Sequence, residues 1–330
     1  MDLNLVWFIL IIVLFTGFFI LEGFDYGVGM MMIGRTRDER TQFVKAIEPV
    51  WDANEVWMIT AGGACFAAFP HFYASMFSTF YLALFLMLLA LILRGVAFEL
   101  RGKFQNSDWV DFWDYAIMFG SFVPAFLWGV AMANLLQGLP LDSHMHYTGK
   151  FLDLLTPFPI ITGLFFVSLF MFHGANFLGL KLADESLLLE LKRDARAVGQ
   201  AAWTSYLCFV IAAVVDTDVM SKASGVLIFA SAMGVLSAGF PSEKKDSPLF
   251  IFVTSTITVT MTIIGIFVAL FPRLMVSSLN PEWSLTIYNA ASTPYTLTIM
   301  TFAAVIFVPI VLFYQRWTYK IFKERIKPIK

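Results

Sequence analysis

Acidic residues recur at helical spacing inside two long apolar stretches near the N-terminus. Glu22 and Asp25 form the first set, and Glu48, Asp52 and Glu55 form the second. In a helix, residues spaced three, four or seven apart share one face. An ionisable side chain inside a bilayer costs about 2.5–3.5 kcal/mol and usually faces protein or water for a functional reason. Because desolvated carboxylates can exchange protons near neutral pH, we predict that these five acids form a proton path.

The same acids also suit a structural role, and both roles can hold together. Arg94 and Glu99 lie in the third apolar stretch, while Asn54 and Trp57 lie among the acids of the second. A buried polar network around Arg94 would fix the packing of the first three spans. Adjacent antiparallel helices would bring the acidic faces of the first two spans to one depth. Both interpretations, proton path and packing network, stay open from the sequence.

The histidines indicate how much redox chemistry the chain can do alone. Haem is held by His, Met, Cys or Tyr from packed helices, and only His173 falls within an apolar stretch. A lone His on an apolar helix is typical of a hydrogen-bonded structural residue. Neither the histidines nor the two cysteines show the spacing of a metal site. We therefore expect no catalytic residue, cofactor or metal in this chain. The other histidines fall in an outer turn and an outer loop: His71, His144 and His146.

Composition identifies the elements that position these side chains. Of 330 residues, 59% are hydrophobic and 14% are charged, whereas soluble domains average about 45–50% and 25%. Apolar runs of roughly 20 residues recur along the chain, which is the length a helix needs to cross a bilayer. We predict an all-α integral membrane protein forming a single polytopic domain over residues 1–330, without a soluble domain. Nucleic acid is not an expected partner at a net charge of −2.

Nine membrane spans are predicted, so the two termini should lie on opposite sides. Lys and Arg concentrate in alternate connections, where 18 of the 22 are found, with three in the intervening segments and Arg94 inside a span. Positive charge marks cytoplasmic loops, which places the N-terminus outside and the C-terminus in the cytoplasm. The cation-rich segments are 34–45, 101–112, 181–198, 241–247 and the tail after 315. The predicted spans are 5–33, 46–68, 75–100, 113–137, 157–180, 199–215, 223–240, 248–270 and 292–314.

Four segments together resemble subunit II of cytochrome bd-type quinol oxidases, and the resemblance extends over essentially the whole chain. The runs Trp-Asp-x-Asn-Glu-Val-Trp and Gly-Phe-Asp-x-Gly-Val-Gly-Met are its most specific parts. The four segments are EGFDYGVGM (22–30), WDANEVWMITAGGACFAAFP (51–70), GSFVPAFLWGVAMANLLQGLP (120–140) and residues 296–314.

The resemblance implies a multi-pass protein of the bacterial plasma membrane, part of a terminal oxidase that oxidises quinol, reduces dioxygen to water and builds a proton gradient. In that family a homologous subunit I carries two b-type haems, one d-type haem and the quinol-binding loop, while subunit II has lost the haem ligands. The implied fold is two four-helix bundles with one peripheral helix. The family's aspartate in the Trp-Asp motif, matched here by Asp52, serves cytoplasmic proton delivery, and Asp25 is carried over with it. The resemblance also allows a small single-helix accessory subunit.

Two other functions use the same residues differently. A proton-coupled secondary transporter would need buried acids, but it should show inverted repeats and interrupted helices around a midplane site. A purely structural assembly subunit would use every carboxylate for packing. Haem bands that depend on a co-purifying partner favour the oxidase, whereas a haem-free preparation that moves a solute favours the transporter.

Overall fold

The structure, a computed structural model, describes residues 2–104, 106–221, 223–239 and 247–328 and consists almost wholly of helices. Within these ranges, seven helices are long and apolar enough to cross a membrane. They correspond to the predicted spans at 5–33, 75–100, 113–137, 157–180, 199–215, 248–270 and 292–314. The remaining predictions, 46–68 and 223–240, correspond to helices of 18 and 16 residues. The count of nine spans and the orientation therefore stay predictions.

The N-terminal half forms one group of helices. α1 packs against α3 and α6, and α5 packs against α6. Phe18 and Phe19 of α1 meet Trp128 of α6 at ring distances of 5.6 and 5.4 Å, so aromatic contacts fill the space between these helices. The elements are α1 (Leu3–Met30), α2 (Arg37–Ile47), α3 (Trp51–Ala68), α4 (Pro70–Thr79), α5 (Tyr81–Leu100) and α6 (Ser107–Gln137).

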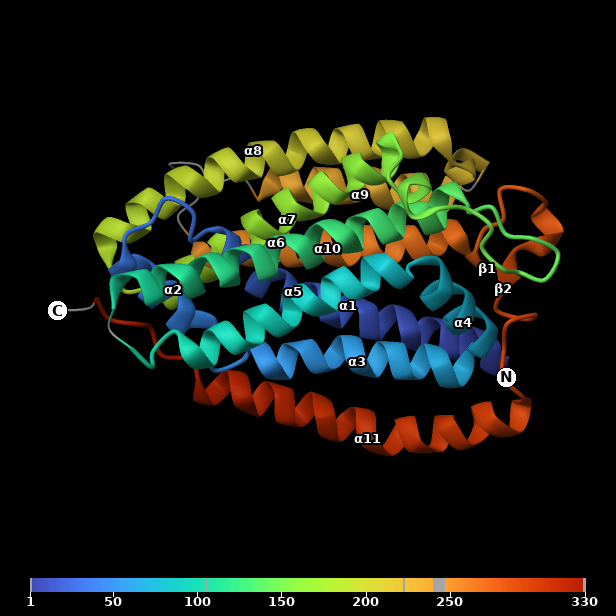
Figure 1. Ribbon diagram of the computed structural model, residues 1–330, viewed down its shortest axis with the longest axis horizontal. Helices are drawn as coiled ribbons and strands as arrows, with labels where there is room; N and C mark the ends of the chain where they lie inside the picture. The colour runs from blue at the N-terminus through green and yellow to red at the C-terminus, as the bar shows by residue number, and fades with distance from the viewer. Residues whose placement is uncertain (1, 105, 222, 240–246, 329–330) are drawn as a thin grey trace.

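Four further helices form a second group, which packs along α1. α7 contacts α8 and α10, α9 contacts α10, and both α7 and α10 lie against α1. Figure 1 shows the helices of both groups running side by side along the long axis of the molecule. The division into two bundles of four helices stays a prediction. The elements are α7 (Pro157–Lys181), α8 (Glu185–Asp216), α9 (Ala223–Ala238) and α10 (Pro248–Leu270).

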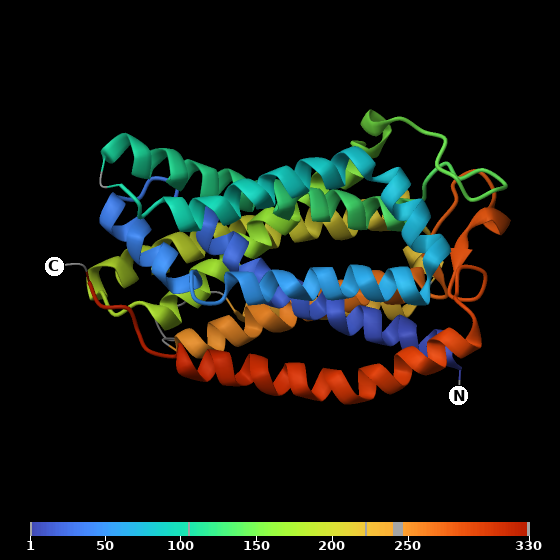
Figure 2. The same ribbon diagram turned by 60° about the horizontal axis from the view of Figure 1, so that its bottom comes forward.

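The last helix, α11 (Pro294–Ile321), is peripheral. It contacts α1 and α3 and runs along the outside of the molecule in both views (Figure 1, Figure 2). Leu297 is its buried residue. α1 begins and α11 ends at opposite ends of the long axis (Figure 1).

The connections at the two ends differ in character. The end where α1 begins carries α4, three single-turn helices and a two-stranded antiparallel hairpin. The opposite end carries α2, which begins with a capping box between Thr36 and Glu39. The remaining short elements are η1 (Phe151–Leu154), η2 (Asp218–Ser221), β1 (Arg273–Met275), η3 (Pro281–Trp283) and β2 (Leu285–Thr286).

Two expected boundaries need correction. The segment 181–198 was predicted as a connection, but α8 begins at Glu185. Leu187, Leu191 and Ala195 are buried at helical spacing, so this stretch is an amphipathic extension of the span. The hydroxyl of Ser186 donates to Asp184 and lowers the pKa of that carboxyl, which caps the helix as an anion.

The second correction concerns the spans at 46–68 and 75–100. α2 ends at Ile47 and α3 begins at Trp51, with Pro49 between them, and a proline has no N–H with which to continue the hydrogen-bond ladder of a helix. The span at 75–100 is likewise two helices, because α4 ends at Thr79 and α5 begins at Tyr81. Residues 241–246 of the predicted cation-rich segment 241–247 lie outside the described residues.

Candidate proton-transfer site

Two acids on α1 point into the first helix group. Glu22 and Asp25 are three residues apart, share one face of the helix, and are both 0% exposed. They lie in the last third of α1, and α1 runs toward the end of the molecule that carries α2 (Figure 1). Their burial means that any charge they carry must be balanced by protein groups.

Arg94 of α5 supplies that balance. Its side chain is 0% exposed and pairs through Nη1 with Glu22, and with Glu55 of α3 at 3.1 Å. The guanidinium also lies over the rings of Tyr26 and Phe98, with its carbon 5.0 and 5.4 Å from the ring centres. One buried cation thus joins α1, α3 and α5.

Asp25 is linked to α3 by an amide instead of a cation. Asn54, which is also 0% exposed, donates from Nδ2 to Asp25 Oδ2 at 2.7 Å. Its Oδ1 accepts from Gln315 Nε2 at 3.2 Å and from the Tyr319 hydroxyl at 2.9 Å, both on α11. The acidic faces of α1 and α3 therefore meet, as predicted, through Arg94 and Asn54.

Several atoms of the cluster have further hydrogen-bonding capacity. Within the described part of the chain, Glu22 Oε2, Asp25 Oδ1, the Tyr26 hydroxyl, and Nε and Nη2 of Arg94 are buried and have no protein partner. Buried polar atoms of this kind are the usual partners of internal water. The site combines three acids, one cation and free donor and acceptor positions, which is what transient proton binding requires.

The comparisons with known proteins bear on this site. The family model described as "Cytochrome bd terminal oxidase subunit II" matches residues 3–322. The chain is 38% identical over 331 residues to "Cytochrome bd ubiquinol oxidase subunit 2" of Bacillus subtilis (strain 168), covering 98% of this chain and 97% of that one. It is 36% identical to "Cytochrome bd-I ubiquinol oxidase subunit 2" of Escherichia coli (strain K12), covering 96% and 93%.

This chain belongs to the cytochrome bd oxidase subunit II family. It is therefore a subunit of a terminal oxidase and a multi-pass protein of the bacterial plasma membrane. The fold is similar to "The structure of bd oxidase from Geobacillus thermodenitrificans", with a TM-score of 0.74, 13% sequence identity and coverage of 98% of this chain and 99% of that one.

Three acids of this subunit II fall outside the buried cluster. Glu48 lies between α2 and α3 and is exposed, so it does not share a helical face with the acids of α3. Asp52 stands in the first turn of α3 and is exposed, as is Glu99 near the end of α5. Helical periodicity correctly predicted that Glu55 faces the cluster. It wrongly placed Glu48 on the same helical face, because the helix is interrupted at Pro49.

Trp57 has a packing contact in place of a polar one. A Cβ added at Gly17 of α1 would collide with the Trp57 ring, so the indole contacts α1 at a point where the helix has no side chain. The buried polar network at this site includes Asn54, Arg94 and the acids that they bind, together with Gln315 and Tyr319 of α11.

Sequence reasoning missed Gln315 and Tyr319. Both lie beyond the predicted span 292–314, and Tyr319 falls in the predicted cationic tail after residue 315. Their signal was the continuation of helical spacing, since they are four residues apart on one face. α11 extends to Ile321, which places both side chains over α3.

His173 does not fit haem ligation. Its Nδ1 lies 2.7 Å from the Ser255 hydroxyl and its Nε2 lies 3.1 Å from the carbonyl of Ile20, so both ring nitrogens have partners. His71, in α4, and the exposed His144 and His146 lie at the opposite end from the acidic cluster. Among the described residues, no three His, Cys, Asp or Glu side chains are arranged to hold a metal ion.

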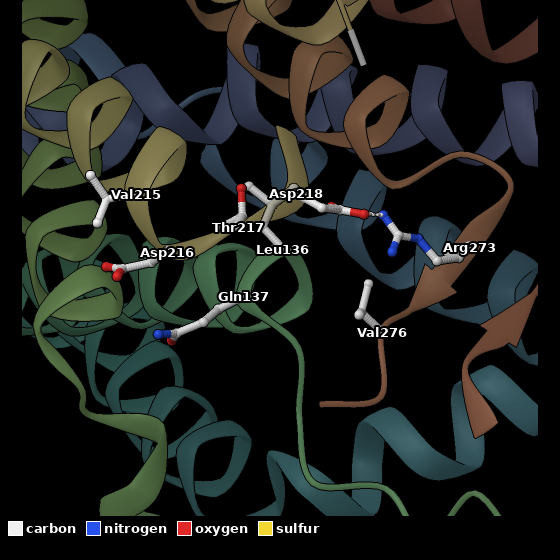
Figure 3. Close-up of a pocket in the computed structure, with 8 residues that line it drawn as sticks. All are labelled: Leu136, Gln137, Val215, Asp216, Thr217, Asp218, Arg273 and Val276. Carbon is white, nitrogen blue, oxygen red and sulfur yellow. Dashed lines mark hydrogen bonds and ion pairs between the residues drawn. The ribbon is translucent and has the colours of Figure 1, made fainter. Parts of the chain in front are cut away.

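A pocket of about 410 Å³ opens at the far end, where α6 and α8 finish and β1 begins. Figure 3 shows Arg273 reaching across it to Asp218, with a 2.7 Å ion pair. Gln137 and Asp216 line the opposite wall. This pocket lies at the end of the molecule where α1 begins, whereas the acidic cluster lies in the last third of α1.

Proposed function

We propose that this subunit II is the haem-free subunit of a quinol:dioxygen oxidoreductase and that it supplies cytoplasmic protons to oxygen reduction in a partner subunit I. Its curated relatives are named as subunits of ubiquinol oxidases. In this proposal subunit I holds the haems and the quinol site, and the complex builds a proton gradient. The chain scaffolds that partner and has no catalytic residue of its own.

The balance of charge in the cluster carries the proposal. Glu22 and Glu55 pair with one buried cation, Arg94, whereas the partner of Asp25 is the neutral amide of Asn54. If all three acids were ionised, the cluster would hold an excess of negative charge in a poorly polarisable interior, where such charge is strongly disfavoured. Protons therefore balance the charge, and they can bind and leave as the surroundings change.

The position of the cluster supports delivery from one side. The side chain of Glu55 is 23% exposed, whereas the side chains of Glu22 and Arg94 are completely buried. A proton arriving at Glu55 thus has a chain of polar groups leading inward. The end of the molecule at which the cluster lies also carries α2 and its arginines, which positive charge assigns to the cytoplasm.

The histidine geometry supports the haem-free assignment. A haem ligand must offer a free ring nitrogen to iron, whereas His173 uses both nitrogens within the protein. No step of the reaction is assigned to a haem in this chain.

Substitution of the buried acids tests the proton path. In the purified complex, Asp25→Asn and Glu22→Gln should each lower turnover with quinol by about 100-fold, as expected when a proton-transfer group is removed. Proton uptake from the cytoplasmic side of vesicles should fall in parallel. Glu99→Gln, which alters an exposed carboxylate at the same end, should leave both quantities unchanged.

The haem content of the co-purified complex distinguishes a defect in proton transfer, which leaves the haem content normal, from failed assembly, which lowers it. Full turnover and proton uptake in both Asp25→Asn and Glu22→Gln would show that the acids only pack. Solute movement by a haem-free preparation would instead support a transporter.

A further inference from the structure

The peripheral helix α11 is tied to the body by polar contacts at its two ends. At its beginning, the indole nitrogen of Trp7 donates to the carbonyl of Leu297 at 3.2 Å and to Thr301 at 3.1 Å. Near its end, Gln315 and Tyr319 donate to Asn54. Between these points the side chains from Val305 to Tyr314 are exposed. At the first anchor α11 accepts hydrogen bonds from the body, and at the second anchor α11 donates them.

The second anchor reaches the acidic cluster. Asn54 is completely buried, and its amide nitrogen lies 2.7 Å from Asp25 Oδ2. The first anchor involves no ionisable partner. Any pair of polar groups could dock a helix. Here two successive hydrogen bonds connect α11 to a carboxylate, the first from Tyr319 to Asn54 and the second from Asn54 to Asp25.

The chemistry of the amide makes the connection directional. An amide oxygen only accepts hydrogen bonds and an amide nitrogen only donates them. Gln315 and Tyr319 present two donors to Asn54 Oδ1, at 3.2 and 2.9 Å, and so occupy both lone pairs of that oxygen. The NH₂ group must then face Asp25. Without the two donors the amide could turn and present its oxygen to the carboxylate.

Tyr319 is itself held in place from two sides. Its ring meets Phe24, the neighbour of Asp25, at 6.5 Å in an edge contact. Just beyond α11, the amide of Ile326 donates to the carbonyl of Lys181 at 2.7 Å, and the amide of Ala183 donates back to Ile326 at 3.0 Å. These backbone bonds fasten the end of α11 to α7, which restricts how far Tyr319 can move.

We propose that Gln315 and Tyr319 are positioning residues for proton transfer at Asp25, acting through the orientation of the Asn54 amide. This inference rests on the proposed proton path. A hydrogen bond from the amide nitrogen stabilises the ionised carboxylate, and α11 thereby sets how readily Asp25 takes up a proton. The charged and titratable groups that interact with Asp25 are Glu22 and Tyr26 on α1, Glu55 on α3, Arg94 on α5 and Tyr319 on α11.

The test uses Gln315→Leu/Tyr319→Phe in the complete oxidase complex. The double variant removes both donors and changes no charged group. We expect maximal turnover to fall about fivefold with the KM for quinol unchanged. A factor of this size corresponds to the net free energy of about one hydrogen bond, the one that orients the Asn54 amide. The pH at which turnover is half-maximal should move upward by about 0.7 units. Tyr319→Phe alone should show a smaller shift, since Gln315 still holds the amide.

Thr301→Val is the matched control, because it removes a side-chain contact at the other anchor of the same helix. It should leave the pH profile unchanged. A shift as large as that of Tyr319→Phe would mean that both act through helix docking, and the proposal would fail.

Two further results separate this proposal from the proton path itself. A wild-type pH profile in the double variant, alongside inactive Asp25→Asn, would overturn the positioning role and leave the path intact. Full activity in Asp25→Asn would remove the path and the positioning role together. If the double variant loses haem and fails to assemble, the near-isosteric Tyr319→Phe decides the question, and an unshifted profile in that variant counts against the proposal.

Discussion

At the residue scale, Arg94 is the group on which the buried cluster depends. It is the cation that Glu22 and Glu55 share, and its side chain has no exposure. Breaking a buried ion pair by removing one partner is far more harmful than replacing the whole pair, because the remaining charge has neither water nor a counter-charge. Arg94 therefore contributes both to the proposed proton path and to the stability of the fold.

We predict that Arg94→Leu lowers the free energy of unfolding by about 3–5 kcal/mol, because it strands the carboxylates of Glu22 and Glu55. Thermal unfolding of the detergent-solubilised complex measures the loss. Adding Glu22→Gln to Arg94→Leu removes one stranded charge and should recover part of the stability. A double variant less stable than Arg94→Leu would contradict this explanation.

At the element scale, glycines decide how closely the two helix groups approach. α1 and α7 cross at Gly27 and Gly174, where a Cβ on Gly27 would lie 2.8 Å from the amide nitrogen of Gly174 and even closer to the carbonyl oxygen of Phe170. Backbone atoms cannot move aside as a flexible side chain can. Small residues at such crossings allow the close packing that stabilises helices in lipid.

Gly27→Ala should therefore lower the free energy of unfolding by about 1–3 kcal/mol, the usual range for overpacking. Gly234→Ala on α9 is the control, because no atom lies within 4 Å of a Cβ built there. That change should be neutral or raise the free energy of unfolding by up to about 1 kcal/mol, since alanine is the better helix former. Equal destabilisation by both changes would show that the crossing is not tight.

At the scale of the whole molecule, ion pairs gather at one end. Arg37 of α2 pairs with Asp111 of α6 at 2.6 Å, and that hydrogen bond raises the pKa of the guanidinium. Arg35, just before α2, pairs with Glu190 of α8 at 2.8 Å and also with Asp194. The end with α2 is thus fastened to both helix groups by charge, and it is the end that the positive-inside rule assigns to the cytoplasm.

Labelling of single cysteines tests this orientation. With the native cysteines replaced, Ser143→Cys lies in the loop before η1 and Asn106→Cys lies between α5 and α6, and both positions are exposed. A membrane-impermeant maleimide added to the outside of spheroplasts should label Ser143→Cys and spare Asn106→Cys. The reverse pattern would invert the topology and place the acidic cluster near the outer face.

Much of the candidate site could be predicted from spacing. Glu22, Asp25 and Arg94 were singled out as charges in apolar stretches, and the structure brings them into one cluster with Glu55. Glu48 was grouped with the acids of α3 because periodicity alone carries no information about the break at Pro49. The contacts of Gln315 and Tyr319 with Asn54 could not be predicted, because helical spacing beyond the apolar run does not show which neighbour the helix contacts.

Hydropathy and charge distribution by themselves indicated a multi-span membrane protein, because a bilayer imposes its requirements on every span separately. The resemblance to the cytochrome bd subunit II family came from the four motif segments. Only the tertiary structure decided which polar side chains are internal. Helical spacing places Asn54, Glu55, Asp52 and Glu99 on particular faces of their own helices, but burial depends on what covers each face. Contacts between helices distant in sequence, α1 with α3 and α5 and α3 with α11, settled that question.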